Sequence, residues 1–226
     1  MEKLIFLVRR AEGLSPEEFR HRYVEAHAPL VLRSFLTLRR YEADLVDRAP
    51  REDDGLRFDA AGQMWFDSLE DFTDPKRLYE SSEAAGIVAR DAAGLFGSVA
   101  AYRVDERVER DYERTWPDGE PSPGTKTIAP LRRAGGLSHE QFVAHWRGTH
   151  ASLALKHVLG IWRYVTNVVL ERVTSDAPEL DGIVEVHYLE ARRFDSSEGE
   201  AIMREDVAQF LQPPAPYRVT EHILRG

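Results

Sequence analysis

The pattern of apolar and polar positions along the chain predicts short strands and amphipathic helices. An apolar run from Leu4 that closes on Arg9 has the length of a buried first strand. After it, Phe19, Tyr23 and His27 recur every four residues. Side chains four residues apart share one face of a helix, so this trio is expected to face the core.

Capping residues and a proline mark the expected ends of this first helix. Ser15 stands where a cap is expected, Pro16 follows at the first helical position, and Glu18 lies three residues after the cap. This is a capping box. Pro29 is expected to end the helix near His27, because the residue before a proline disfavours the helical conformation.

The whole pattern returns 123 residues later. Positions 9–30 and 132–153 are identical at eleven of twenty-two sites, and the second helix again carries a stripe of Phe142, Trp146 and His150. Near the end of each copy, residues 102–104 return as 217–219, at an offset of 115. Such self-similarity indicates a duplicated unit. A segment rich in proline and glycine separates the copies. The expected organisation is repeat one at 1–108, a linker at 109–124 and repeat two at 125–226.

Each copy reads as strand, helix, strand, strand, helix, strand. A split βαβ unit of this kind forms a ferredoxin-like α+β sandwich with both helices on one sheet face. The other face needs a cover, and the linked copy supplies one. We therefore expect two ferredoxin-like βαββαβ repeats packed sheet to sheet, as an intrachain pseudo-dimeric α+β barrel. In repeat one, the strands after the first helix are expected at 41–46, at 62–66 and from 101, with a second helix at 75–93 and a possible break at Gly86. In repeat two, the corresponding strands are expected at 164–170, at 183–189 and from 217, with a second helix at 196–210.

Composition narrows the classes of function. The net charge of −9 comes without any lysine-rich or arginine-rich tract, which argues against nucleic-acid binding. The absence of cysteine excludes disulfides, thiolate zinc sites and cysteine nucleophiles. The sequence has no run of eighteen apolar residues, which a membrane span would need, and its first residues are not expected to form a signal peptide. A cytoplasmic protein is therefore expected. No glycine-rich nucleotide loop occurs, and the histidine spacing predicts no metal site.

His27 and His150 are the first candidates for chemistry. Histidine titrates near neutral pH and suits proton transfer. Each of the two follows an aromatic residue by one turn, at the end of the stripe that faces the core. A hydrogen-bonded core histidine that only packs the helix against the sheet is the alternative.

The third strand of repeat two carries two more candidates. Glu185 and His187 share one face of the strand, and the more apolar face is expected to meet the helices. The polar pair then looks toward the other sheet, as an acid–base pair or as a satisfied polar patch. Repeat one has Gln63 and Trp65 at the corresponding positions, so the two copies cannot do the same work there.

Further residues are candidates for a ligand pocket. Arg9 and Arg132 close the first strands and could bind a carboxylate, although an ion pair at the sheet end is favoured. Tyr41 and Tyr164 open the second strands and could line a pocket, although a core role is favoured. Tyr23, Trp146 and Trp65 complete this set of expected pocket residues.

The motif around these residues resembles the EthD domain of the dimeric α+β barrel superfamily. It consists of a strand ending in Arg-Arg, then Gly-Leu-Ser, a helix with Phe and a second aromatic, and His-Ala. The resemblance covers 3–106 and 125–224, and residues 66–72 also resemble the family, whereas 188–194 have drifted. EthD proteins are associated with ether degradation and fungal polyketide pathways. The superfamily includes cofactor-free monooxygenases, cyclases, isomerases and haem enzymes, so the fold does not settle function.

The resemblance implies a cofactor-independent enzyme that transfers protons on a small hydrophobic, aromatic or polyketide-like carbonyl compound. The alternatives are a non-catalytic binding or stability factor and a haem-dependent relative. A homodimer of the tandem chain is plausible. We expect the more reactive site in repeat two, with His150 as acid–base and His187, oriented by Glu185, as a second polar group.

Overall fold

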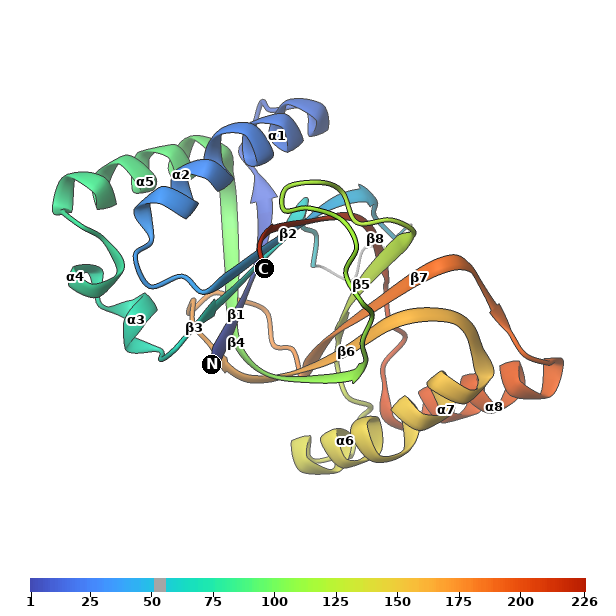
Figure 1. The fold of residues 1–226 in the computed structure, drawn as a ribbon. Coiled ribbons are helices and arrows are strands. Elements are labelled where there is room, and N and C mark those ends of the chain that lie inside the picture. Colours follow the sequence, from blue (N-terminus) through green and yellow to red (C-terminus); the bar gives the residue numbers. More distant parts are fainter. Residues whose placement is uncertain (51–55) are drawn as a thin grey trace.

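The computed structural model describes residues 1–50 and 56–226. Both halves follow the order strand, helix, strand, strand, helix, strand, with some helices divided into shorter segments, as Figure 1 shows. The first half contains β1 (Glu2–Arg10), α1 (Pro16–Arg22), η1 (Tyr23–His27), α2 (Ala28–Ser34), β2 (Arg40–Arg48), β3 (Ala60–Phe66), α3 (Glu70–Thr73), α4 (Pro75–Leu78), α5 (Ser82–Leu95) and β4 (Phe96–Arg110). The second half contains β5 (Thr125–Leu131), α6 (His139–His145), η2 (Trp146–His150), α7 (Ala151–His157), β6 (Val158–Arg172), β7 (Gly182–Phe194), α8 (Ser197–Phe210) and β8 (Tyr217–Arg225).

The strands form one closed barrel in the order β1-β3-β2-β8-β5-β7-β6-β4 (Figure 1). The expectation of two ferredoxin-like sheets packed face to face is therefore wrong. Two antiparallel seams join the halves edge to edge, β2 with β8 and β4 with β6. Face packing would leave the outer strands of both sheets unpaired, whereas the seams satisfy their backbone hydrogen bonds. Each sheet then covers its inner face by closing around a shared interior.

The first helix of each half is capped as expected but does not end as expected. Both capping boxes form, at Ser15 and at Ser138. The helix then widens into a π-helical turn, η1 or η2, and continues as α2 or α7. The prediction that Pro29 ends the helix is wrong. The Ala28 N–H bonds to the Tyr23 carbonyl five residues back, so the hydrogen-bond register changes just before the proline. Pro29 falls in the first turn of α2, where its missing N–H needs no helical partner.

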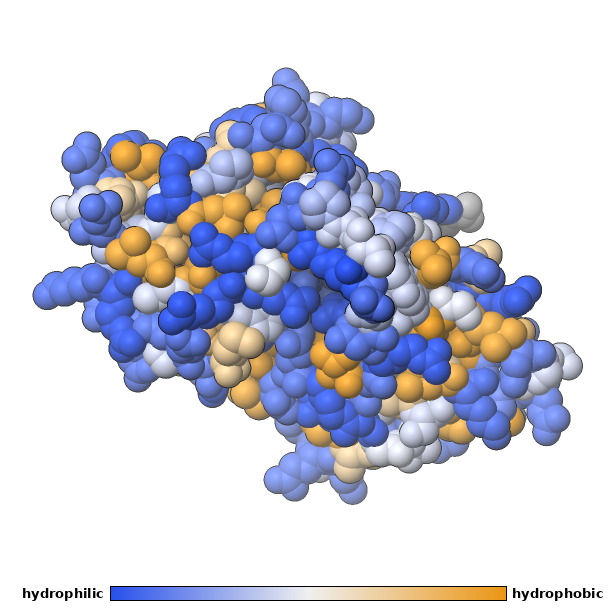
Figure 2. Space-filling view, in the orientation of Figure 1, coloured by the Kyte–Doolittle hydropathy of each residue, from blue (hydrophilic) through white to orange (hydrophobic). Residues whose placement is uncertain are grey.

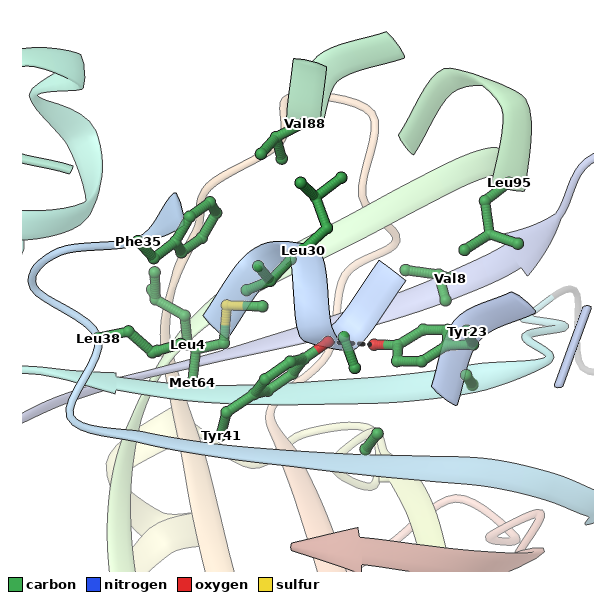
Figure 3. Packing of buried hydrophobic residues seen from close by; sticks show 14 of the residues in the cluster. Leu4, Val8, Tyr23, Leu30, Phe35, Leu38, Tyr41, Met64, Val88 and Leu95 are labelled. Carbon is green, nitrogen blue, oxygen red and sulfur yellow. Dashed lines mark hydrogen bonds between the residues drawn. The ribbon is translucent and has the colours of Figure 1, made fainter. Parts of the chain in front are cut away.

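The helices lie outside the barrel, one group against each half (Figure 1). In the first half they bury a dense cluster that includes Leu4, Leu30, Phe35 and Met64, and Figure 3 shows these side chains meeting between helix and sheet. The second helix of this half is broken at residues 79–81, between α4 and α5, and Gly86 lies inside α5. The described residues include no helix that is long and apolar enough to cross a membrane.

The barrel interior has two different ends. One end is apolar and includes Ile5, Leu7, Ile128 and Ile183. The other end is covered by the segment expected to be the linker. Its Tyr112 ring stacks on Trp162 at 4.4 Å between centroids. The Gly119 N–H donates to the Ile223 carbonyl on β8 (2.7 Å). These contacts make the segment a cap on the barrel rather than a free tether.

Candidate functional site

A cavity of about 520 Å³ lies in the second half, between the outer face of its sheet and its helices. Most of its wall is apolar, and this volume lies in the range typical of small-molecule sites. Figure 2 shows apolar residues gathered on the β7–α8 side of the molecule, at the right of the view. The wall includes Ala129 and Leu131 of β5, Val184 and Val186 of β7, Trp146 and His150 of η2, Ala154 of α7, Tyr164 of β6, and Met203 and Val207 of α8.

His150 is held against this cavity by an aspartate. Its Nδ1 lies 2.6 Å from Asp206 Oδ2, and the other oxygen of Asp206 lies 2.7 Å from His145 Nε2. Asp206 comes from α8 and is 5% exposed. Because Nδ1 donates to the carboxylate, a neutral His150 carries its lone pair on Nε2. Burial lowers the pKa of His150, and the bond and charge of Asp206 oppose that shift. The ring therefore stays neutral and basic near pH 7.

Trp146 and Tyr164 form a second polar contact at the same cavity. The Trp146 indole Nε1 donates to the Tyr164 hydroxyl at 3.2 Å. Both side chains are almost fully buried, at 1% and 2% exposure. Burial raises the pKa of Tyr164, so the phenol stays protonated. The structure thus brings together three of the residues expected at a site, His150, Trp146 and Tyr164.

The first half repeats the histidine–aspartate pair but not the open space. His27 Nδ1 lies 2.7 Å from Asp91 Oδ2. At the offset of 123, larger side chains stand where the cavity of the second half is lined by smaller ones: Leu4 for Thr127, Phe6 for Ala129, Val31 for Ala154 and Phe35 for Val158. These residues pack into the apolar cluster of the first half. His27 is therefore surrounded by packed side chains, with Phe96 at 4.9 Å between ring centroids.

Tyr23 and Tyr41 also belong to this packed cluster. Their hydroxyls are hydrogen bonded to each other at 3.1 Å, as the dashed line in Figure 3 shows. Burial raises the pKa of Tyr23 to about 12. Both rings fill space in this core and share one hydrogen bond, which is the core role that the sequence left open for them.

A second polar group lies inside the barrel and follows the internal repeat. Lys3 Nζ is 2.7 Å from Glu106 and 3.0 Å from Glu185. Lys126 Nζ is 2.5 Å from Glu221 and 2.7 Å from the other oxygen of Glu185. Lys3 and Lys126 are equivalent at offset 123, and Glu106 and Glu221 at offset 115. Glu185 thus bridges the two halves, with both its oxygens bound to ammonium groups.

The repeat is broken at two positions in this cluster. Asp44 corresponds to Asn167, and Gln63 to Glu185. The Gln63 amide donates to Asp44 (2.6 Å) and to Glu185 (2.8 Å). Burial and the neighbouring charges of Glu221 and Glu185 raise the pKa of Asp44 to about 7, although Lys126 opposes them. Four buried carboxylates share the Lys126 ammonium, so their mutual repulsion adds to the effect of burial on this pKa.

The carboxylates could suggest a metal site. Oxygens of Glu42, Glu185 and Glu221 lie within 4.8 Å of one another. The Lys126 Nζ, however, lies 2.5–3.9 Å from oxygens of all three. An ammonium group in that place repels a second cation, so this cluster is an ion-pair network that ties the halves together.

Glu185 and His187 do not serve His150, and the expectation that they would assist it is wrong. Both face the barrel interior, whereas Val184 and Val186 of the same strand line the cavity on the other face. Glu185 binds the two lysines. His187 Nε2 donates to the Pro123 carbonyl of the cap at 3.0 Å. Burial lowers the pKa of His187 to about 4, and the positive charge of Lys126 adds to that shift.

The remaining expected residues lie away from the cavity. Arg9 is exposed, and Arg132 Nε donates to the Glu179 carbonyl at 3.2 Å. The ion pairs at the strand ends are made by their neighbours, Arg10 with Asp59 and Arg133 with Asp181. Trp65 is inside the barrel, where the Lys3 ammonium lies 4.6 Å from its ring centroid.

Sequence reasoning missed Asp91 and Asp206. Neither stands in a recognisable motif, and both lie on the second helix, far along the chain from the histidines. The signal that could have found them is the second offset. The shift of 115 that aligns Tyr102 with Tyr217 also aligns Asp91 with Asp206.

Comparisons with known proteins agree with the duplicated architecture. The EthD domain matches residues 11–97 and again residues 134–214. An anthrone oxidase-like protein of known structure superimposes with a TM-score of 0.61 at 12% identity, over 99% of this chain and 92% of that one. A monooxygenase-like protein of Fusobacterium nucleatum gives 0.56 at 7% identity (99% and 92%), and one of Lactobacillus acidophilus gives 0.51 at 10% (99% and 96%). At such identities the structural likeness shows the fold alone. No curated protein matches the chain.

Proposed function

The chain belongs to the EthD domain family and carries two copies of that domain, and from this premise we propose that its second copy is a proton-transferring enzyme. The substrate would be a small hydrophobic, aromatic or polyketide-like carbonyl compound. One observation carries the proposal: His150, held at Nδ1 by Asp206, lies at the wall of a mostly apolar cavity of about 520 Å³.

The geometry supports an acid–base role for His150. A base must be positioned, must be neutral at working pH and must present a lone pair to the substrate. Asp206 fixes the ring and its tautomer, burial keeps the pKa low, and Nε2 is the nitrogen left for a ligand in the cavity. When Nε2 takes a proton from a carbon next to a carbonyl, the imidazolium that forms is stabilised by the Asp206 carboxylate.

The cavity supports the choice of substrate class. Its wall is mostly alkyl and aromatic, which favours a flat apolar body over a charged or sugar-like one. The anthrone oxidase-like neighbour bears the name of a tricyclic aromatic ketone, which makes aromatic ketones a reasonable first set of compounds to try. Dehydration, cyclisation and enolisation begin with removal of a proton next to the carbonyl, and decarboxylation ends with protonation of the enolate that loss of CO2 leaves. His150 and Asp206 supply the groups that this proton transfer requires, so the proposed reaction needs no cofactor.

The test is hydrogen exchange catalysed on a panel of aromatic and β-dicarbonyl ketones in deuterium oxide. Wild-type protein should incorporate deuterium next to the carbonyl of at least one compound faster than buffer does, as followed by proton NMR. A protein that binds these compounds, shown by fluorescence quenching, but exchanges none would be a binding module, and the enzymatic proposal would be wrong. A Soret band in the purified protein would instead support the haem-dependent alternative.

A further inference from the structure

We propose that the Tyr164 hydroxyl donates a hydrogen bond to an oxygen of the bound compound, so that the cavity selects molecules with a carbonyl or phenol oxygen beside the atom that His150 deprotonates. This inference rests on the proposed function and adds Tyr164 to His150 as a second polar group that contacts the compound. In the step, the C–H bond breaks, the proton moves to His150 Nε2, and the electron pair stays in the enolate. Tyr164 keeps its proton and stabilises the enolate oxygen.

The direction of one hydrogen bond carries the argument. An indole N–H can only donate, so Tyr164 must accept the 3.2 Å bond from Trp146. The hydroxyl proton of Tyr164 then needs an acceptor of its own. Over residues 1–50 and 56–226, the structure gives Tyr164 no acceptor for that proton, and the hydroxyl-bearing side chain lines the cavity. A ligand oxygen is the partner that this donor lacks.

The first half shows what the exchange of one aromatic residue does. Tyr23 stands where the second half has Trp146, and the Tyr41 hydroxyl donates to it at 3.1 Å. There the strand tyrosine donates its proton to the helix tyrosine, inside a packed core. With Trp146 the donor and acceptor roles are reversed, and the strand tyrosine is left with a free proton. Gly182 makes room for the larger ring, because a Cβ there would overlap the indole.

The position of Tyr164 completes a two-point recognition of the compound. Trp146 and His150 lie four residues apart in η2, so both side chains project from the same helical wall. Tyr164 projects from β6 on the sheet side of the same cavity. Burial keeps the phenol neutral and therefore able to donate. A hydrocarbon of the same shape would leave this buried donor unpaired, which disfavours its binding.

The experiment compares 2-naphthol with naphthalene as probes of the full-length protein by fluorescence titration. Wild type should bind 2-naphthol at least about tenfold more tightly than naphthalene. Tyr164→Phe should remove most of that preference while leaving the affinity for naphthalene unchanged, and the control Tyr41→Phe should behave as wild type. Thermal melts establish that each variant is folded.

A second variant keeps the test decisive if Tyr164→Phe does not fold. Tyr164→Leu also removes the hydroxyl, so it should lose the preference for 2-naphthol in the same way. If a folded Tyr164→Phe or Tyr164→Leu variant retains the full preference, Tyr164 is not the donor, although the proposed function survives. If wild type binds neither probe, the cavity is not a site for such compounds, and both the inference and the proposed function are wrong.

Discussion

His150 and Asp206 form a 2.6 Å hydrogen bond between a π-helical turn and the second helix, across residues that are 56 positions apart in the chain. The same bond joins His27 to Asp91 in the first half. What distinguishes the copies is therefore not the pair but its surroundings, a packed core in one and an open apolar cavity in the other.

Replacing Asp206 by Asn should weaken His150 as a base. The bond and charge of Asp206 raise the pKa of His150 against the effect of burial. Without the carboxylate, the pKa of His150 should fall further, and the exchange rate should drop at least about tenfold. NMR titration of the histidine rings measures the pKa. Asp91→Asn is the matched control and should leave the rate unchanged. An unaltered His150 pKa in Asp206→Asn would mean that the carboxylate does not tune it.

Filling the cavity should weaken ligand binding without harming the fold. Ala129→Phe introduces the side chain that the first half carries as Phe6 at the equivalent position. We expect 2-naphthol affinity to fall by at least about tenfold, with a melting temperature close to that of wild type, because apolar space is filled. Ala144→Phe, on the exposed side of α6, is the control for added bulk. A folded Ala129→Phe variant with wild-type affinity would place the ligand elsewhere.

The stability of the Asp44→Asn variant should increase relative to that of wild type as the pH rises. The pKa of Asp44 is about 7 in the fold, against 3.8 for a free aspartate side chain. Its stabilising contribution is thus present at low pH and is lost as pH rises toward 7, when the crowded carboxyl must ionise. Asn167, at the equivalent position of the other half, already has the neutral form.

The measurement is urea unfolding of wild type and Asp44→Asn between pH 4.5 and 8. Over this pH range, the free energy of unfolding of Asp44→Asn should rise by a few kcal/mol relative to that of wild type. Asp47→Asn, an exposed aspartate on the same strand, should run parallel to wild type. A constant difference between Asp44→Asn and wild type at all pH values would show that Asp44 does not hold a proton.

His187 should have the opposite effect on stability. Its pKa is lowered from 6.5 to about 4 because it is buried. The neutral ring therefore stabilises the fold above pH 6.5, and this contribution is lost as pH falls toward 4. Between pH 6.5 and 4, the free energy of unfolding should fall by about 3 kcal/mol more in wild type than in His187→Gln. His21→Gln, on an exposed position of α1, is the control. Equal acid sensitivity of wild type and His187→Gln in urea unfolding would refute the assignment.

The sequence predicted much of the local structure. The repeat located the strands and helices, and the period of two along β7 correctly separated Glu185 and His187 from Val184 and Val186. Closure of the barrel could not be predicted in this way, because the β2–β8 and β4–β6 seams are backbone pairings that no side-chain motif marks.

The candidate site was predictable only in part. His150, Trp146 and Tyr164 were recognisable because they recur or align between the copies. The open space beside them was not, because it results from several small differences in side-chain volume, such as Ala129 against Phe6. The role of Glu185 was misjudged because its partners, Lys3 and Lys126, are on strands whose mutual arrangement only the closed barrel sets.

The central claim is that the second copy alone carries the acid–base histidine, and one comparison tests it most directly. The rate of solvent deuterium exchange on the best compound of the panel is measured for His150→Gln and for His27→Gln, each shown to be folded by thermal melt. His150→Gln should lose at least about a hundredfold in rate, and His27→Gln should retain the wild-type rate. Full activity in His150→Gln together with loss of activity in His27→Gln would contradict the claim and place the reactive site in the first copy.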